Sequence, residues 1–140
     1  MSTEVVNQEN QQWRSKDVKF RTPITLKGID AQVFVDGELL QYDVADDTWI
    51  KYAGAAAADF ARAILSLGVG ESITLDVADT LTPAATICVE GEVIESALTF
   101  PVGVTIDDAP AGAALSVREQ LREVGIIARS ADKINESNLG

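Results

Sequence analysis

Short runs in which apolar and polar residues alternate cover most of this chain, and this pattern is typical of β-strands. The runs that fit a strand lie at residues 24–26, 32–35, 38–42, 49–52, 72–77, 86–93 and 97–106. The sequence therefore predicts a mainly β protein whose sheet grows from pairings between neighbouring runs.

Pairs that contain glycine indicate where the chain turns. Asp36–Gly37 separates two of the runs, and this dipeptide is typical of a two-residue type I′ hairpin, which needs positive φ at both positions. Glu90–Gly91 interrupts the run at 86–93 and predicts the centre of a second hairpin. Gly68–Gly70 follows a predicted helix instead of opening one after a strand, so we interpret it as a turn and not as a phosphate-binding loop.

The stretch 55–67 carries the clearest helical pattern, because its apolar residues recur at helical spacing and would form one face. These residues are Ala56, Phe60, Ala63, Ile64 and Leu67. An apolar face needs a covering partner, so we expect this helix to pack on the sheet.

A capping-box pattern, in which Ser116 is followed by Glu119, favours a helix over 117–124 that ends at Gly125. The alternative is a long strand that runs through Val117. In both cases we expect a strand after Gly125.

The predicted fold is a mainly β, small barrel- or sandwich-like single domain with one short packed α-helix and an extended N-terminal arm. A length of 140 residues fits one hydrophobic core, since such cores serve roughly 100 to 200 residues. We expect the arm at residues 1–22, the β-rich domain at 23–131 and a polar C-terminal tail at 132–140.

Charge is distributed unevenly along the chain, whose formal net charge is −11. Residues 14–27 hold five basic residues and one acid, whereas residues 30–108 hold fifteen acids and only Lys51 and Arg62 as basic residues. A basic segment of this kind either folds back on its own acidic domain, reaches an acidic neighbour or remains a passive tail. Large aromatic residues favour the first two alternatives. The candidate interface residues are Trp13, Arg14, Lys16, Lys19, Phe20 and Arg21.

Candidate chemistry is sparse in this sequence. The chain has no histidine, which excludes the imidazole-based nucleophile triads and the usual zinc sites that contain histidine. The lone Cys88 lies in a β-branched run and is expected to be buried and structural. The acid pairs Asp46–Asp47 and Asp107–Asp108 point to opposite faces of a strand or lie in loops, so they do not converge on a reacting atom. We therefore expect no enzyme, no cofactor and no metal site.

Two further classes of partner are disfavoured. A strongly acidic surface repels phosphate, so we expect no nucleic-acid partner. No apolar stretch reaches the roughly 18 residues that a membrane span needs, and the N-terminus lacks the apolar core of a signal peptide. We expect no membrane partner and a soluble product that carries no export signal.

One segment carries a family resemblance. The stretch from Phe100 to Val117, FPVGVTIDDAPAGAALSV, resembles the cement or decoration proteins of tailed-bacteriophage capsids. In that family a small barrel-like domain often carries a GVAxxDAxAGxxVxV stretch, in which a strand turns through Asp-Ala and Ala-Gly into another strand. The resemblance implies a homotrimer on the capsid exterior that contacts the major capsid protein and braces the shell.

The alternative function is a soluble acidic binding module. A nucleic-acid mimic would need carboxylates spaced like phosphates along a helix or ridge, whereas the acids here are scattered over predicted loops. A carbohydrate-binding β domain would need exposed aromatic residues near polar loops, and Trp49 and Tyr52 beside Asp46–Asp47 are the candidates.

Overall fold

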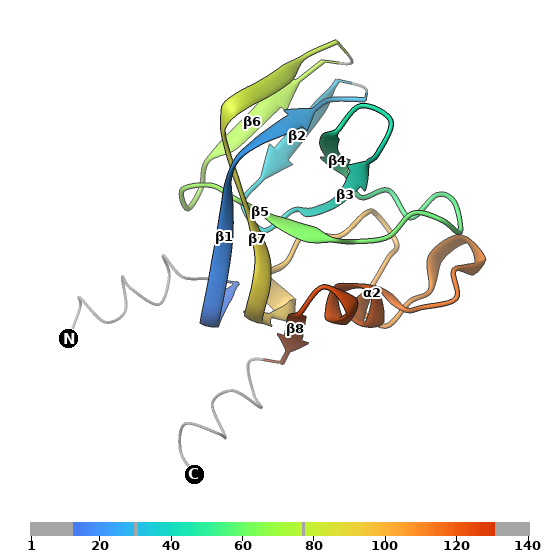
Figure 1. The fold of residues 1–140 in the computed structure, drawn as a ribbon. Helices are drawn as coiled ribbons and strands as arrows, with labels where there is room; N and C mark the ends of the chain where they lie inside the picture. Colours follow the sequence, from blue (N-terminus) through green and yellow to red (C-terminus); the bar gives the residue numbers. More distant parts are fainter. Residues whose placement is uncertain (1–12, 30, 77, 131–140) are drawn as a thin grey trace, which may run out of the picture.

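A computed structural model describes residues 13–29, 31–76 and 78–130 of the chain (Figure 1). Its strands are β1 (Arg14–Lys27), β2 (Gln32–Val35), β3 (Leu39–Asp43), β4 (Thr48–Lys51), β5 (Ala63–Ser66), β6 (Ser72–Leu75), β7 (Thr80–Ile94) and β8 (Ile126–Arg129). The helical segments of this described part are the α-helix α2 (Val117–Glu123) and the 3-10 helices η1 (Glu95–Ala97) and η2 (Pro110–Gly112). The predicted mainly β fold with one short α-helix is confirmed.

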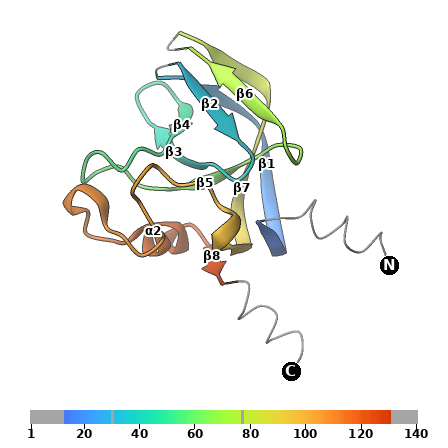
Figure 2. The same ribbon diagram turned by 180° about the vertical axis from the view of Figure 1, so that it is seen from behind.

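The strands form a closed ring with two additions. The main sheet has the order β1-β4-β3-β5-β7-β8, and a further pairing between β1 and β7 closes the ring. β2 and β6 form a separate two-stranded sheet. The long strands β1 and β7 lie side by side along the molecule, with β2 and β6 at one end and α2 and β8 at the other (Figure 1 and Figure 2).

The core lies on both faces of β5, the central strand between β3 and β7. Ile64 belongs to a cluster that includes Trp13 and Leu121. Its neighbours Ala63 and Leu65 belong to a second cluster. Because successive side chains of a strand point to opposite faces, a central strand buried on both faces needs an unbroken apolar run.

The predicted helix over 55–67 is wrong, and the burial of β5 explains the error. A strand that is buried on both faces is apolar at every position. Its sequence therefore also fits the spacing of apolar residues in a helix, and the two structures cannot be distinguished by this pattern. The preceding alanines form a loop instead of a helix: the N–H groups of Ala55 and Ala56 both donate to Asp59 Oδ2 at 3.0 Å. The predicted turn at Gly68–Gly70 is confirmed, because the Glu71 N–H donates to the Gly68 carbonyl at 2.9 Å.

The chain does turn at Asp36–Gly37, but the predicted hairpin is wrong. The Glu38 N–H donates to the Val35 carbonyl at 3.2 Å. Gly37 has a φ of +88°, whereas Asp36 does not have positive φ, so the turn fits type II and not type I′. The flanking strands separate, because β2 pairs with β6 while β3 pairs with β4 and β5. The strand after the turn, β3, instead forms an antiparallel hairpin with the next strand along the chain, β4.

The second predicted hairpin is also wrong, because β7 continues through Glu90–Gly91 without turning. Gly91 has a φ of +128° and lies where the backbone of β1 passes close to β7. A Cβ at this position would lie 2.6 Å from the Cα atom of Val18. The glycine therefore permits close contact between two strands instead of a reversal of the chain.

The predicted strand at 97–106 is absent from the described structure. The chain there passes from η1 into loops, with one isolated bridge between Thr99 and Glu38. The Thr105 N–H donates to Asp108 Oδ2 at 2.8 Å, and the Val104 N–H donates to the Pro101 carbonyl at 3.0 Å. These local hydrogen bonds replace those of a sheet. The strand-turn-strand structure that the family resemblance implies for Phe100–Val117 is therefore wrong for this chain.

The capping box is confirmed, and the alternative of a long strand is excluded. The Glu119 N–H donates to Ser116 Oγ at 3.2 Å, and the Ser116 N–H donates to Glu119 Oε1 at 3.0 Å. The backbone hydrogen bond from Ser116 lowers the pKa of Glu119. Gly125, with a φ of +94°, follows the helix, and β8 then pairs in parallel with β7. The predicted strand after Gly125 is confirmed.

Candidate functional site

The predicted boundary between an arm and a domain falls inside β1. This strand pairs with β7 from Arg14 opposite Val93 to Lys27 opposite Thr80, so residues 13–22 are part of the domain. The basic segment thus folds back on its own acidic body, which is one of the alternatives that the charge pattern leaves open. Residues 1–12 and 131–140, which hold the rest of the predicted arm and the whole predicted tail at 132–140, lie outside the described residues.

Trp13 is a core residue and not an exposed anchor. Its side chain has 0% exposure and packs in the cluster that contains Leu39 and Val93. Its carbonyl accepts a hydrogen bond from the Ile94 N–H at 2.8 Å. Burial of the indole takes it away from the surface, so Trp13 offers no exposed side chain for the partner interface that the sequence predicts.

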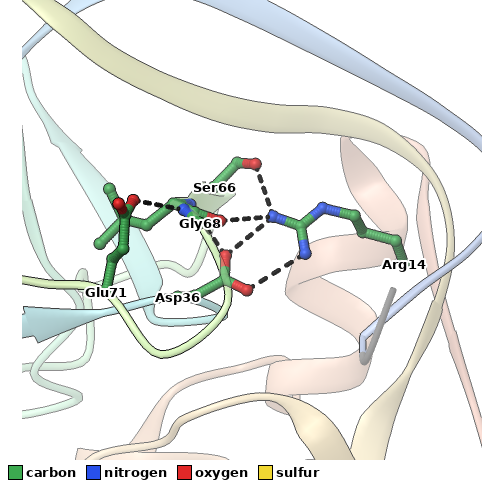
Figure 3. A network of polar contacts seen from close by, with 6 residues as sticks. Arg14, Asp36, Ser66, Gly68 and Glu71 are labelled. Atoms are coloured by element: carbon green, nitrogen blue, oxygen red, sulfur yellow. Dashed lines mark hydrogen bonds and ion pairs between the residues drawn. The ribbon is translucent and has the colours of Figure 1, made fainter. Parts of the chain in front are cut away.

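Arg14 is held by a polar network inside the chain (Figure 3). Its Nη1 lies 3.1 Å from Asp36 Oδ2, and its Nη2 lies 2.9 Å from Asp36 Oδ1. Nη2 also donates to Ser66 Oγ at 2.8 Å and to the Leu67 carbonyl at 3.0 Å. Asp36 Oδ1 accepts a further hydrogen bond from the Leu67 N–H at 2.8 Å. The network fastens the start of β1 to the loops that follow β2 and β5.

Four of the six candidate interface residues remain exposed on β1. Lys16, Lys19, Phe20 and Arg21 all have exposed side chains. Lys19 Nζ lies 3.1 Å from Glu90 Oε2, but both side chains are more than half exposed. Such a pair contributes little to stability and leaves the charge available to a partner. Phe20 is 48% exposed, which is unusual for a large aromatic residue on a strand. We call these four residues the β1 surface.

A groove of about 770 Å³ lies between β1, the β3–β4 hairpin and the loop before β5. Its lining includes Arg21, Gln41, Tyr42, Phe60, Val89 and Val124. Of these residues, sequence reasoning proposes only Arg21 for an interface; Asp47 and Trp49, which also line the groove, are proposed for carbohydrate binding. The remaining lining residues come from segments that are distant in sequence. They lie close together only because the ring of strands closes, so no short sequence pattern could have indicated the groove.

Aromatic and charged groups in the groove interact with one another. Arg62 lies over the Phe60 ring at 4.8 Å, donates to the Gln120 carbonyl at 3.0 Å and pairs with Glu123 at 2.9 Å. Tyr42 donates a short hydrogen bond to Asp47, and this bond raises the pKa of Tyr42.

The acid pairs do not converge on a common point. Asp46 forms an ion pair with Lys27, while Asp47 accepts from Tyr42. Asp107 accepts from Arg118 Nε at 2.9 Å, and this hydrogen bond lowers the pKa of Asp107. Within residues 13–29, 31–76 and 78–130, no group of three or more cysteine or acidic side chains is placed to hold a metal ion.

Cys88 is buried, as predicted. Desolvation by its surroundings raises the pKa of the thiol to about 11, so the thiol is protonated at neutral pH. This environment disfavours the nucleophilic thiolate.

The aromatic residues proposed for carbohydrate binding are not available on the surface. Trp49 is 9% exposed and Tyr52 is 1% exposed. Sugar rings stack on exposed aromatic faces, so these two residues do not form such a platform. The observation removes the feature that favoured a carbohydrate-binding domain.

The sequence matches no protein-family model, and it matches no curated protein. No helix in the described part of the chain is long and apolar enough to cross a membrane.

Proposed function

We propose that this protein is a non-enzymatic virion protein that binds the outer surface of a bacteriophage capsid shell and stabilises it. Its partner would be the major capsid protein, and it would act as a homotrimer on the capsid exterior. The observation that carries the proposal is the β1 surface, where three basic residues and the half-exposed Phe20 lie on one strand of a chain with a net charge of −11.

Rigidity of the β1 surface supports this role. Pairing with β7 and the contacts of Arg14 with Asp36 hold the strand that carries the surface. A preformed surface loses little conformational entropy when it binds. Many copies on one shell would then add weak contacts through multivalency, which is how a small protein can brace a large assembly. The resemblance of Phe100–Val117 to decoration proteins supports the proposal at the level of sequence alone, because the segment does not form the strand-turn-strand structure that the resemblance implies.

The proposal is tested with undecorated particles of the major capsid protein from the same virus. We expect saturable binding of the purified chain, a higher unfolding temperature of the decorated shell, and a trimer by native mass measurement on or off the shell. Lysozyme-sized acidic proteins of unrelated fold serve as the control for non-specific binding. If the chain does not bind at concentrations up to about 100 times a micromolar dissociation constant, the proposal is wrong.

A further inference from the structure

β2 and β6 form a sheet of their own, so each of these strands has one outer edge (Figure 2). The outer edge of β2 is covered by side chains of neighbouring segments. The Val33 carbonyl accepts a hydrogen bond from Lys51 Nζ at 2.6 Å. The Val35 N–H donates to Glu38 Oε1 at 3.4 Å. Val33 and Val35 therefore direct their backbone groups away from β6.

The outer edge of β6 has no such cover in the described part of the chain. Thr74 lies opposite Val33, and Ser72 lies opposite Val35. Opposite residues of an antiparallel ladder either exchange both hydrogen bonds or both point outward. Ser72 and Thr74 therefore direct their N–H and C=O groups away from β2, and both residues are exposed. Because β6 pairs only with β2, these four groups have no backbone partner among the described residues.

β8 shows, by contrast, how a free edge is closed in this fold. The strand pairs only with β7, and the Gly125 carbonyl just before it accepts from the Gly91 N–H at 3.1 Å. Backbone groups alternate in direction along a strand, so Ala128, three residues further on, directs its carbonyl away from β7. Arg118 Nη1 donates to this carbonyl at 2.7 Å. An open edge is a template for a strand of another chain, and β6 offers one where β2 and β8 do not.

The side chains of β6 determine which residues can be placed beside it. Ile73 is partly buried and packs against the cluster that contains Phe34 and Leu75. Ser72 and Thr74 lie on the opposite, exposed face. An added strand would place every second side chain next to Ile73 and the others next to the two hydroxyls. β6 contains no charged residue or proline and pairs with β2 without a bulge, so it lacks the usual protections of an edge.

Carboxylates frame both ends of this edge. Glu71 precedes β6, Asp76 and Asp79 follow it, and all three are exposed. Glu71 Oε1 accepts from the Gly68 N–H at 2.8 Å, as Figure 3 shows. Asp79 Oδ2 accepts from the Asp76 N–H at 2.9 Å. These donors are uncharged, so the negative charges remain, and residues 63–117 contain no lysine or arginine that could compensate them.

Basic residues from other segments do not neutralise this charge. Three of them belong to segments that hydrogen-bond to β2 or to the loops on either side of β6. Each forms an ion pair with a different acid: Arg14 with Asp36, Lys27 with Asp46 and Lys51 with Glu38. Charge complementarity at the two ends of β6 therefore favours a partner segment with basic residues, and it disfavours a second copy of this acidic chain.

We propose that the outer edge of β6 binds an extended segment of a partner protein by strand addition. The backbone of the segment pairs with Ser72 and Thr74, and an apolar side chain packs beside Ile73. Basic residues at the ends of the segment pair with Glu71 and Asp76. Main-chain hydrogen bonds provide affinity in this mode of recognition, and the side chains provide specificity. The proposal does not rest on the proposed function, because β6 carries none of the residues of the β1 surface.

The test uses the full-length protein, labelled with ¹⁵N, and a blocked peptide with the sequence Lys-Thr-Val-Thr-Val-Thr-Lys. We expect shifts in the amide signals of Ser72, Ile73 and Thr74. At a peptide concentration about ten times the dissociation constant, hydrogen exchange at Ser72 and Thr74 should slow about tenfold. The matched peptide Glu-Thr-Val-Thr-Val-Thr-Glu should bind at least about tenfold more weakly at low salt. The double variant Glu71→Gln, Asp76→Asn should reduce this difference.

Thr74→Pro removes one outer N–H, which the pairing with β2 does not use, and should abolish peptide binding. Thr74→Val is the matched control, because it keeps the N–H and the branched side chain, and it should bind like the native protein. The exchange measurement on the native protein decides the case even if the proline variant does not fold.

Equal binding of the two peptides, or shifts confined to residues outside β6 and its flanking loops, would overturn the proposal. Exchange at Thr74 in the free protein that is as slow as at Ile73 would show that the edge is not open, and would also overturn it. Protection that grows with protein concentration alone would assign the edge to a second copy of this chain, against the proposal. Failure of capsid binding leaves these results unaffected.

Discussion

Arg14 and Asp36 form a two-bond ion pair that joins the first described strand to a turn 22 residues further along the chain. The side chain of Asp36 is 4% exposed and that of Arg14 is 19% exposed. The carboxylate also accepts the Leu67 N–H, so one acid serves three donors. The pair anchors the start of β1, whose backbone pairs with β7, to the turn after β2.

Asp36→Ala should lower the free energy of unfolding by about 2 kcal/mol, because it leaves a partly buried guanidinium and a backbone N–H without their acceptor. Urea denaturation measures the change. Lys19→Ala removes the exposed pair with Glu90 and should change the stability by less than about 1 kcal/mol. Equal losses in the two variants would contradict the structural role of the network.

Trp13→Ala and Phe20→Ala compare two aromatic residues that both lie within the predicted arm, residues 1–22. Trp13 is fully buried, so its truncation should cost about 3–5 kcal/mol. Phe20 is 48% exposed, and its truncation should change the stability by less than about 1 kcal/mol. Thermal and urea unfolding of both variants measure the difference. A small effect of Trp13→Ala would mean that the segment is not anchored in the core.

The segments that sequence reasoning predicted well are those that local hydrogen bonds specify. The side chains of Ser116 and Glu119 each accept a hydrogen bond from the other residue's backbone N–H. The start of α2 can therefore be predicted from the four residues 116–119 alone. The segment around Ile64 could not be predicted in this way. Its alanine-rich sequence is compatible with a helix, and only its position between β3 and β7 makes it a strand.

The same reasoning explains what was missed at the candidate site. A basic, aromatic segment has no local property that distinguishes a strand of its own sheet from an arm that reaches a neighbour. Its pairing with β7 spans from Arg14 opposite Val93 to Lys27 opposite Thr80, and such long-range pairings leave no short sequence pattern. The groove at Arg21 depends on the same closure of the ring.

Gly37→Ala and Gly70→Ala separate steric contact from backbone strain. Both glycines have positive φ, so alanine is strained at each and costs about 1 kcal/mol. A Cβ at Gly37 would also lie 3.0 Å from both the Ala97 carbonyl oxygen and Trp13 Cδ1, whereas a Cβ at Gly70 meets nothing within 4 Å. Gly37→Ala should therefore be the more destabilising variant in urea denaturation. The reverse order would show that Trp13 does not pack against this turn.

Acid should weaken the contact between Asp107 and Arg118. The folded state lowers the pKa of Asp107, so the charged carboxylate adds stability above the pKa of the unfolded chain, and this stability is lost as pH falls through the folded pKa. Asp107→Asn should have a lower unfolding temperature than the native protein at neutral pH and the same one near about pH 2. Circular dichroism melts across this range measure the difference. Parallel curves would contradict the assignment.

Binding of the labelled protein to undecorated capsid particles across a salt series tests the central claim most directly. The native protein should bind more weakly as salt rises, because exposed charges are screened beyond about 10 Å at roughly 0.1 M. The double variant Lys16→Gln, Lys19→Gln should associate more slowly and show a flatter salt dependence, while Phe20→Ala should mainly dissociate faster. If all three proteins bind with the same affinity at every salt concentration, the β1 surface does not contact the capsid and the account is contradicted.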